Sequence, residues 1–148
     1  MAVTESREVV IEATPAEIMD VVLDLESLTE WSSVHHEVEI LERDGRGLPR
    51  RSRQVVRILG LSDEQVLAYT VHDDGVGWTL ESATQQRALS GRYTLIPQGE
   101  STRVRFEITV DLAMPVPGFL IKKGAKGLMD TATEGLRRRV LEVKKGAG

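Results

Sequence analysis

The sequence predicts an α+β fold in which a curved antiparallel sheet of about seven strands wraps around a long C-terminal helix, with two short helices after the first strand. Three observations lead to this prediction. They are a helix-capping signal near the N-terminus, a central block in which apolar and polar residues alternate, and helical spacing of apolar residues near the C-terminus. A sheet with one apolar face and a helix with one apolar stripe both bury that surface when they pack together.

The N-terminal part is predicted to form one strand and two short helices. Residues 7–13, REVVIEA, are typical of a short strand. Thr14 can then cap a helix, Pro15 suits its first position, and Glu17 can complete a capping box. Apolar residues continue at helical spacing to about residue 24, namely Ile18, Val21, Val22 and Leu25. A second helical piece is expected at residues 27–31.

The central block is predicted to form six antiparallel strands, which gives seven with the first. Turn signals interrupt the alternation at Asp44-Gly45, Asp74-Gly75 and Gln98-Gly99-Glu100. The strands are expected at residues 34–43, 51–59, 64–72, 77–82, 90–97 and 102–112. The last of these alternates most regularly, so one face of the sheet is expected to be buried and the other wet.

The C-terminal part is predicted to be one long helix. Pro115 and Pro117 exclude regular structure before it, and residues 119–144 could reach about 40 Å, enough to cross a sheet. One stripe is apolar, with Ile121, Ala125, Leu128, Ala132, Leu136, Val140 and Val143. Gly124, Gly127 and Gly135 lie inside this helix at a cost of ~1 kcal/mol each. Either the helix approaches the sheet closely there, or the missing side chains leave room for a ligand.

Composition narrows the function classes. The chain has 148 residues, 41% of them hydrophobic, so residues 1–148 are expected to form one domain. The net charge of -4 provides no basic field for nucleic acid, and the absence of cysteine excludes disulfides and thiolate chemistry. No signal peptide and no apolar run near ~20 residues is present, so a cytoplasmic location without stable membrane insertion is expected. Transient membrane contact stays open, as does the choice between monomer and homodimer.

Two adjacent histidines, His35 and His36, raise the question of a metal site. Neighbouring side chains on a strand point to opposite faces, so the two rings are not expected to bind the same ion. The run HEVEI also places Ile40 where an HExxH motif needs its second histidine. We therefore expect neither a metal nor a cofactor.

Strand parity then separates the two histidines. The face of His36 carries Val34, Val38 and Ile40, and the face of His35 carries Glu37 and Glu39. This parity predicts that His36 points inward, either as a histidine of the core or sheet edge or as a polar contact to a ligand. Trp31 is expected to be either a hydrophobic plug or part of a pocket wall.

The inner face of the sheet is predicted to be mostly apolar. In the strand expected at residues 51–59, Ser52 and Gln54 lie on the same face as Val56 and Ile58. If this face points inward, Ser52 and Gln54 are the polar groups of an apolar wall. On the next strands, the residues expected on the inward face are Leu67, Tyr69, Trp78, Leu80, Tyr93, Leu95, Phe106 and Ile108. Core packing explains each residue. However, the chain has only two Trp, two Tyr and two Phe, and so few bulky side chains favour an unfilled cavity.

Motifs for common catalytic chemistry are missing. The sequence contains no GxSxG, no phosphate-binding GxxxxGK[ST], no GxGxxG and no readable pair of carboxylates. No general acid or base stands out with an evident partner. The catalytic residues, if there are any, are therefore unknown at this stage.

Four segments occur in an order typical of a known family: IEATPAEIMDVVLDLESLTEW, VEILERDGRG, SGRYTLIPQGESTRVRFEITVDL and MPVPGFLIKKGAKGLMDTATEGLRRRV. In these segments, which span nearly the whole chain, the sequence resembles the START-like or Bet v 1-like (SRPBCC) superfamily, specifically its bacterial polyketide cyclase/dehydrase and lipid transport branch. The resemblance implies a helix-grip fold with a deep, mostly apolar pocket between sheet and helix. The long helix and the MPVPG segment would then gate entry.

The resemblance implies binding of a hydrophobic or aromatic small molecule such as a lipid, polyketide or quinone, with transport of that molecule left open. It also leaves open a polyketide aromatase/cyclase or dehydratase that uses the same pocket, with Tyr69, Tyr93, Ser52 and Arg53 or Arg92 orienting the substrate. The residues expected to line the ligand site are Trp31, His36, Val38, Ile40, Ser52, Val56, Ile58, Leu67, Tyr69, Trp78, Leu80, Tyr93, Leu95, Phe106, Ile108, Leu128 and Ala132.

Overall fold

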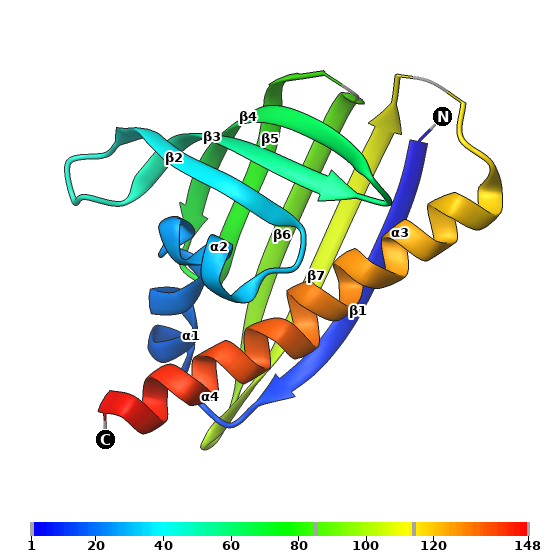
Figure 1. Cartoon of the computed structure of the whole chain (residues 1–148). Helices are drawn as coiled ribbons and strands as arrows, with labels where there is room; N and C mark the ends of the chain where they lie inside the picture. The colour runs from blue at the N-terminus through cyan, green and yellow to red at the C-terminus, as the bar shows by residue number, and fades with distance from the viewer. Residues whose placement is uncertain (1, 85, 114, 148) are drawn as a thin grey trace.

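The sheet has seven strands, all antiparallel to their neighbours, in the order β1-β7-β6-β5-β4-β3-β2. The computed structural model describes residues 2–84, 86–113 and 115–147. The strands are β1 (Ala2–Ile11), β2 (His35–Arg43), β3 (Pro49–Ile58), β4 (Leu61–His72), β5 (Gly75–Ala83), β6 (Gln86–Gln98) and β7 (Ser101–Leu112). The sheet curves around the C-terminal helix (Figure 1). The predicted helix-grip architecture is confirmed.

The segment between β1 and β2 folds into α1 (Pro15–Val22), a 3-10 turn η1 (Leu25–Ser27) and α2 (Leu28–Trp31). The predicted capping box is present at the start of α1. The Glu17 N–H donates to Thr14 Oγ1 at 3.2 Å, and the Thr14 N–H donates to Glu17 Oε1 at 2.9 Å. Helix α1 buries the predicted apolar face, Ile18, Val21 and Val22.

Several strands extend beyond their predicted ends. Strand β1 begins at Ala2 rather than at residue 7, because residues 2–6 pair with residues 107–111 of β7. Strand β6 begins at Gln86 rather than at residue 90, because its first residues pair with the end of β7. In both cases the pairing partner, and not the local alternation of residues, sets the length of the strand.

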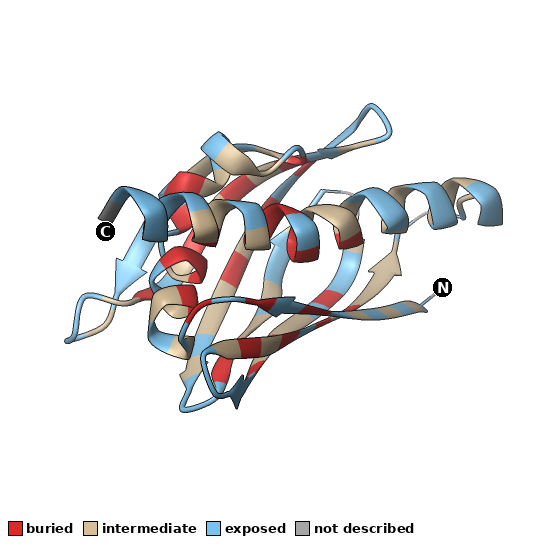
Figure 2. Cartoon of the chain, turned by 90° about the horizontal axis from the view of Figure 1, so that it is seen from below, coloured by how far each residue is buried: buried red, intermediate tan, exposed pale blue. Residues whose placement is uncertain are grey.

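The C-terminal helix runs in three segments: α3 (Gly118–Asp130), a π-helical turn η2 (Thr131–Gly135) and α4 (Leu136–Ala147). In α3, all of whose residues are described, Met129 is the one buried residue. The rest of the helix is held by the core, with Ala132, Thr133, Gly135, Leu136 and Val140 buried. Figure 2 shows this contrast, since buried residues give way to exposed and intermediate ones along α3. The two halves of the helix are therefore anchored unequally.

Candidate ligand-binding cavity

A cavity of about 360 Å³ lies between the inner face of the sheet and α3. Its walls come from the start of β1, from His35 of β2, from β3 to β7, from α1 to α2 and from the C-terminal helix, and they are mainly apolar. Many residues predicted for the ligand site line it: Trp31, Val56, Ile58, Leu67, Tyr69, Trp78, Tyr93, Phe106, Ile108, Leu128 and Ala132. The cavity thus occupies the space beneath the weakly buried half of the helix.

Other predicted residues lie outside the cavity lining, namely His36, Val38, Ile40, Ser52, Leu80 and Leu95. Leu95 belongs to the buried core, and Leu80 packs against that core. Val38 and Ile40 lie on the inner face, paired with Gln54 and Ser52, but β2 contacts η1 and α2 there. For all of them except His36 the predicted face was right, and the cavity ends before it reaches them.

The prediction for His36 was wrong, because β2 contains a bulge at this residue. His35 pairs with Val56 and Glu37 pairs with Val55, which leaves His36 as the extra residue between them. Residues that pair directly project to the same face of the sheet, so His35 follows the buried Val56 inward. His36 is exposed, and His35 lines the cavity in its place.

His35 is held in a defined tautomer by Ser32. The Ser32 hydroxyl accepts from the N–H groups of Val34 and His35, each at 3.3 Å, and lies 2.6 Å from His35 Nδ1. Because the hydroxyl already accepts from two N–H groups, we infer that its proton goes to Nδ1 and that the neutral ring carries its own proton on Nε2. Burial, and then the neighbouring His36, lower the pKa of His35 to about 4. At pH 7 the ring is neutral.

The two tyrosine hydroxyls are engaged by the protein. Tyr69 Oη lies 2.7 Å from Oγ of the fully buried Ser52, and Tyr93 Oη donates to the Ala132 carbonyl at 2.8 Å. Burial raises the pKa of Tyr69 to about 12 and also raises the pKa of Tyr93. Both phenols therefore stay protonated at pH 7, and Tyr93 ties the sheet to the π-helical turn.

An aromatic cluster forms the cavity floor on β5, β6 and β7. Ring centroids are 5.7 Å apart for Trp78 and Tyr93, 5.9 Å for Trp78 and Phe106, and 5.0 Å for Tyr93 and Phe106. Gly91 makes room for the indole, since a Cβ atom there would lie 2.3 Å from Trp78 Cε2. A glycine on β6 thus allows Trp78 to lie flat against the sheet.

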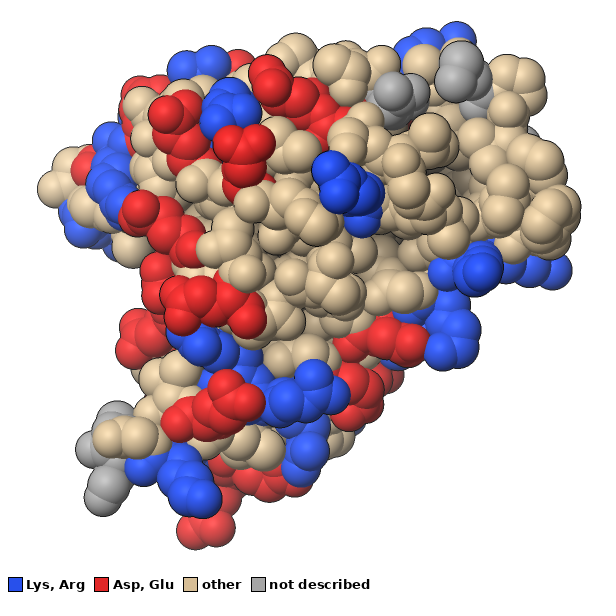
Figure 3. All heavy atoms as spheres, viewed as in Figure 1, with Lys and Arg blue, Asp and Glu red and all other residues tan. Residues whose placement is uncertain are grey.

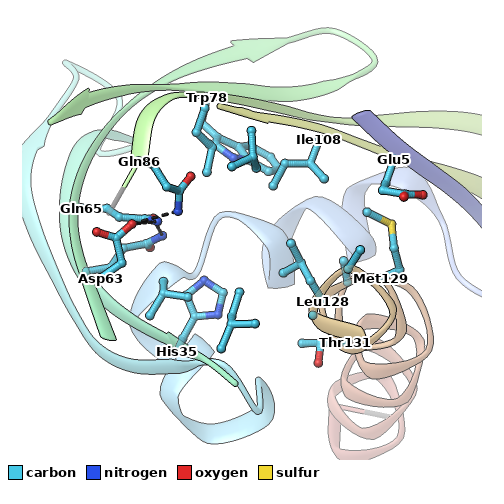
Figure 4. Close-up of a pocket in the computed structure, with 18 of the residues that line it drawn as sticks. Glu5, His35, Asp63, Gln65, Trp78, Gln86, Ile108, Leu128, Met129 and Thr131 are labelled. Atoms are coloured by element: carbon cyan, nitrogen blue, oxygen red, sulfur yellow. Dashed lines mark hydrogen bonds between the residues drawn. The ribbon is translucent and has the colours of Figure 1, made fainter. Parts of the chain in front are cut away.

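One end of the cavity carries a chain of polar side chains that begins at Asp63. Gln65 Nε2 and Gln86 Nε2 donate to Asp63 Oδ2 at 2.9 and 2.8 Å, and Gln54 Nε2 donates to Gln65 Oε1 at 3.3 Å. The N–H and hydroxyl of Thr84 donate to Asp63 Oδ1 at 2.9 and 2.8 Å. Figure 4 shows Asp63, Gln65 and Gln86 together on one side of the cavity, across from Leu128 and Met129. This chain is the main polar feature of the walls.

The two amide oxygens at the ends of this chain have no hydrogen-bond partner. Gln54 Oε1 and Gln86 Oε1 are both buried, and neither is bonded to any residue that the structure describes. Gln54 as a whole is only 4% exposed, and both residues line the cavity. Buried acceptors are usually satisfied, so these two are an exception at this site.

Next to this polar chain, two residues from Asp63 along β4, the cavity reaches the surface between α3 and the β3–β4 hairpin. Its lining continues there to Leu59 and Leu61, which are 45% and 55% exposed, and to Val116 and Leu120. Figure 3 shows a largely uncharged area over this part of the molecule. At Gly124, a Cβ atom would lie 3.0 Å from Ile58 Cγ2, so the helix approaches the hairpin closely at this glycine. Gly127 is exposed, and a Cβ atom there would have nothing within 4 Å.

The candidate arginines lie away from the cavity. Arg53 pairs with Glu39 at 3.3 Å and with Glu64 at 3.4 Å, and Arg92 pairs with Asp74 at 2.9 Å. Within the described part of the chain, no three His, Asp or Glu side chains are placed to hold a metal ion. None of the described helices is long and apolar enough to cross a membrane.

Two features of the cavity were missed at the sequence level. The inward turn of His35 depends on a bulge, which the alternating pattern does not reveal. Asp63, Gln65 and Gln86 were not recognised, although Gln65 shares its parity with Leu67 and Tyr69 and so carried a readable signal. Gln54 was anticipated as a polar group of this wall, and the structure places it there.

Comparisons with known proteins agree with this geometry. Residues 2–141 match the family model described as polyketide cyclase / dehydrase and lipid transport. No curated protein matches the sequence. A START superfamily protein from Mycobacterium smegmatis is 25% identical over 95% of this chain and 98% of its own, with a TM-score of 0.85. A protein from Thermus thermophilus is 25% identical over 97% of this chain and 99% of its own, with a TM-score of 0.77.

An enzyme structure shares the fold at lower identity. The Zhui aromatase/cyclase from Streptomyces sp. R1128 superimposes with a TM-score of 0.85 over 100% of this chain and 99% of its own, at 13% identity. At this identity the similarity concerns the fold alone.

Proposed function

The chain belongs to the polyketide cyclase/dehydrase and lipid transport family, and on this basis we propose that its cavity binds a hydrophobic or aromatic small molecule of the lipid, polyketide or quinone class. The observation that carries the proposal is the apolar cavity of about 360 Å³ between the sheet and α3. A ligand of this kind gains free energy when its apolar surface leaves water for such walls.

The ligand enters, in this proposal, at the end of the cavity next to α3. The exposed Leu59 and Leu61 provide an apolar rim there, and α3 is held by fewer buried residues than the segment that follows it. A segment with few buried contacts opens at a lower free energy than the core does. The ligand body then lies on the aromatic floor of Trp78 and Phe106, opposite Leu128.

An enzyme that cyclises or dehydrates a polyketide in the same cavity is the competing function. Proton transfer at neutral pH is most efficient from a group whose pKa lies near 7. The pKa of His35 is lowered to about 4 and that of Tyr69 is raised to about 12, and the hydroxyls of Tyr69 and Tyr93 are already bonded to the protein. These properties favour binding over catalysis.

Native mass spectrometry of the purified chain, compared with its denatured mass, tests the proposal. We expect a copurified adduct that is lost on denaturation. Both tryptophans of the chain, Trp31 and Trp78, line the cavity, so intrinsic fluorescence reports added ligands as well. An adduct-free native mass, together with no fluorescence response to lipids, quinones or aromatic compounds, would contradict the proposal. The enzyme is supported instead if the protein turns over a bound polyketide and if Tyr69→Phe abolishes this turnover while it keeps the affinity.

A further inference from the structure

Asp63 determines which atom of each glutamine amide in the polar chain donates a hydrogen bond and which atom accepts one. An amide group is a donor at its nitrogen and an acceptor at its oxygen. Because Gln86 turns Nε2 toward Asp63 Oδ2, its oxygen must point away from the carboxyl group. Gln65 also gives Nε2 to Asp63, so it offers Oε1 to Gln54, which donates its own Nε2. The oxygen of Gln54 is left over at the end of this chain.

At both ends of this polar chain, the atom left without any hydrogen bond is therefore an acceptor. Gln54 Oε1 and Gln86 Oε1 are the two buried side-chain atoms without a partner among the described residues. A buried acceptor without a donor is unfavourable, and a ligand that brings a donor removes this cost. A ligand that brings a carboxylate would instead place acceptor against acceptor.

His35 adds a donor next to this polar chain, on the neighbouring strand β2. Its pairing partner Val56 lies two residues from Gln54 on β3, and Figure 4 shows the His35 ring pointing into the cavity below Asp63. Since Ser32 occupies Nδ1, the Nε2–H group is the donor that remains. The cavity thus offers acceptors and a donor within one region. A hydroxyl group is the small neutral group that can bond to both.

We propose that the cavity selects an apolar ligand that carries a hydroxyl group, such as a phenol or an alcohol, whose O–H donates to Gln54 Oε1. This inference rests on the proposed function and specifies the polar group of the ligand. The hydroxyl oxygen accepts from His35 Nε2–H, while the apolar body extends toward Trp78 and Leu128. Molecules of equal size that carry an ether or a carboxylate at this place bind more weakly.

The test is isothermal titration calorimetry with three probes: 2-naphthol, 2-methoxynaphthalene and naphthalene. The naphthol donates a hydrogen bond, the methyl ether only accepts one, and naphthalene measures the apolar contribution alone. We expect 2-naphthol to bind the wild type on the order of tenfold more tightly than the ether. In Gln54→Leu this ratio should fall toward one while the affinity for naphthalene is kept. The matched control is Gln98→Leu, an exposed glutamine outside the cavity, which should leave every affinity unchanged.

Asp63→Asn gives the sharper result, because it reverses the direction of the hydrogen bonds between these polar side chains. The new side-chain nitrogen donates to Gln65 and Gln86, which must then present their oxygens to it and turn Nε2 away. Gln54 flips in turn, so donors replace acceptors at both ends and the preference moves to 2-methoxynaphthalene. Circular dichroism checks the fold of this variant, and Gln54→Leu carries the test if Asp63→Asn does not fold.

The outcomes separate this inference from the function on which it rests. Equal affinities of the wild type for 2-naphthol and 2-methoxynaphthalene, or a ratio unchanged in Gln54→Leu, would overturn the hydroxyl selection and leave the binding function standing. If none of the three probes binds, naphthalene included, the binding function itself is overturned for aromatic ligands, and the hydroxyl selection falls with it.

Discussion

At the scale of single residues, His35 combines a polar ring with an apolar environment. It lines the cavity, its Nδ1 is bonded to Ser32, and its pKa is lowered to about 4 by burial and by His36. Protonation of this ring would place a charge against apolar walls. The folded state therefore prefers the neutral form, and this preference links the stability of the protein to pH.

We predict a loss of stability in acid that depends on His35. The folded pKa lies below the ordinary value of 6.5, so the contribution of the neutral ring is complete above pH 6.5 and is lost as the pH falls toward 4. The loss amounts to no more than about 3 kcal/mol. Urea denaturation at pH 7 and at pH 4.5 should show a smaller drop for His35→Gln than for the wild type. The exposed His72→Gln is the control, and an equal drop in all three proteins would contradict the prediction.

Residue orientation was predictable where the strand is regular. On β3 the alternation placed Ser52, Gln54 and Val56 inward, and all three are buried. On β2 the same reasoning failed for His36, because this extra residue leaves His35 on the inner face in its place. A bulge depends on the pairing between two strands, so a period-two pattern in one of them does not reveal it.

At the scale of elements, the β3–β4 hairpin contains a strained residue at the cavity rim. Ile58 pairs with Leu61, which leaves Leu59 and Gly60 as the two-residue turn, with φ of 54° and 80°. This geometry suits Asn-Gly, and a leucine in the left-handed region is unfavourable. Leu59 is also 45% exposed and lines the cavity. The turn therefore carries an apolar side chain at some expense of stability.

We predict that Leu59→Asn stabilises the fold by about 1 kcal/mol, because asparagine tolerates the left-handed conformation. Urea denaturation measures the change. Leu61→Asn is a matched control, since Leu61 is exposed in the same hairpin and has no positive φ. This control should give no gain. A Leu59→Asn protein no more stable than its Leu61→Asn counterpart would speak against strain in the turn.

The C-terminal helix changes character at the π-helical turn η2. The Tyr93 hydroxyl donates to the Ala132 carbonyl in this turn at 2.8 Å, and the Thr133 hydroxyl donates to the Met129 carbonyl at 2.7 Å. A π turn frees a backbone carbonyl from the regular ladder and is frequent at functional sites. Tyr93 thus fixes the point where the anchored half of the helix meets α3.

We predict that Tyr93→Phe destabilises the protein by about 1 kcal/mol, because the buried Ala132 carbonyl loses its donor. Amide hydrogen exchange should become faster in α3, residues 118–130. Tyr69→Phe removes a hydrogen bond within the sheet and serves as the control, since it should leave exchange in α3 unchanged. Equal exchange in the two variants would contradict a special role for the bond to Ala132.

Elements were predictable from local sequence where local chemistry determines them. The capping box at Thr14 and the turn at Asp44-Gly45 were found in this way, and the turn predicted at Asp74-Gly75 lies one residue earlier, at Asp73-Asp74; a few neighbouring residues satisfy the backbone there. The early start of β1 and the π turn in the C-terminal helix depend on contacts with distant strands. The helical spacing of residues 119–144 therefore predicted one uninterrupted helix.

At the scale of the whole molecule, the two halves of the C-terminal helix have different surroundings. Ile11, Ile18, Val104, Leu136 and Val140 are almost fully buried, and none of them lines the cavity. The cavity lies instead under α3, whose side chains Ala125 and Leu128 are only partly buried. The second half of the helix is therefore packed into the core, and α3 covers the cavity.

We predict that Ala125→Phe blocks the cavity without unfolding the protein. The added ring enters unfilled space, so the free energy of unfolding should stay equal or rise by about 1 kcal/mol. The Kd for naphthalene should rise on the order of tenfold or more, because the ring occupies the volume of the ligand. Gly127→Ala is the control, since it lies on the same helix with nothing within 4 Å of the new methyl group. Unchanged naphthalene affinity in Ala125→Phe would mean that the ligand binds elsewhere.

The separation of core and cavity along the helix also bears on how such a protein changes over generations. Substitutions at cavity positions such as Leu128 change the shape of the cavity while Leu136 and Val140 continue to hold the helix to the sheet. If the cavity binds a ligand as proposed, its shape can therefore change one substitution at a time at a limited cost to the fold. The half of the helix that contributes least to stability is the half on which selection is most free to act.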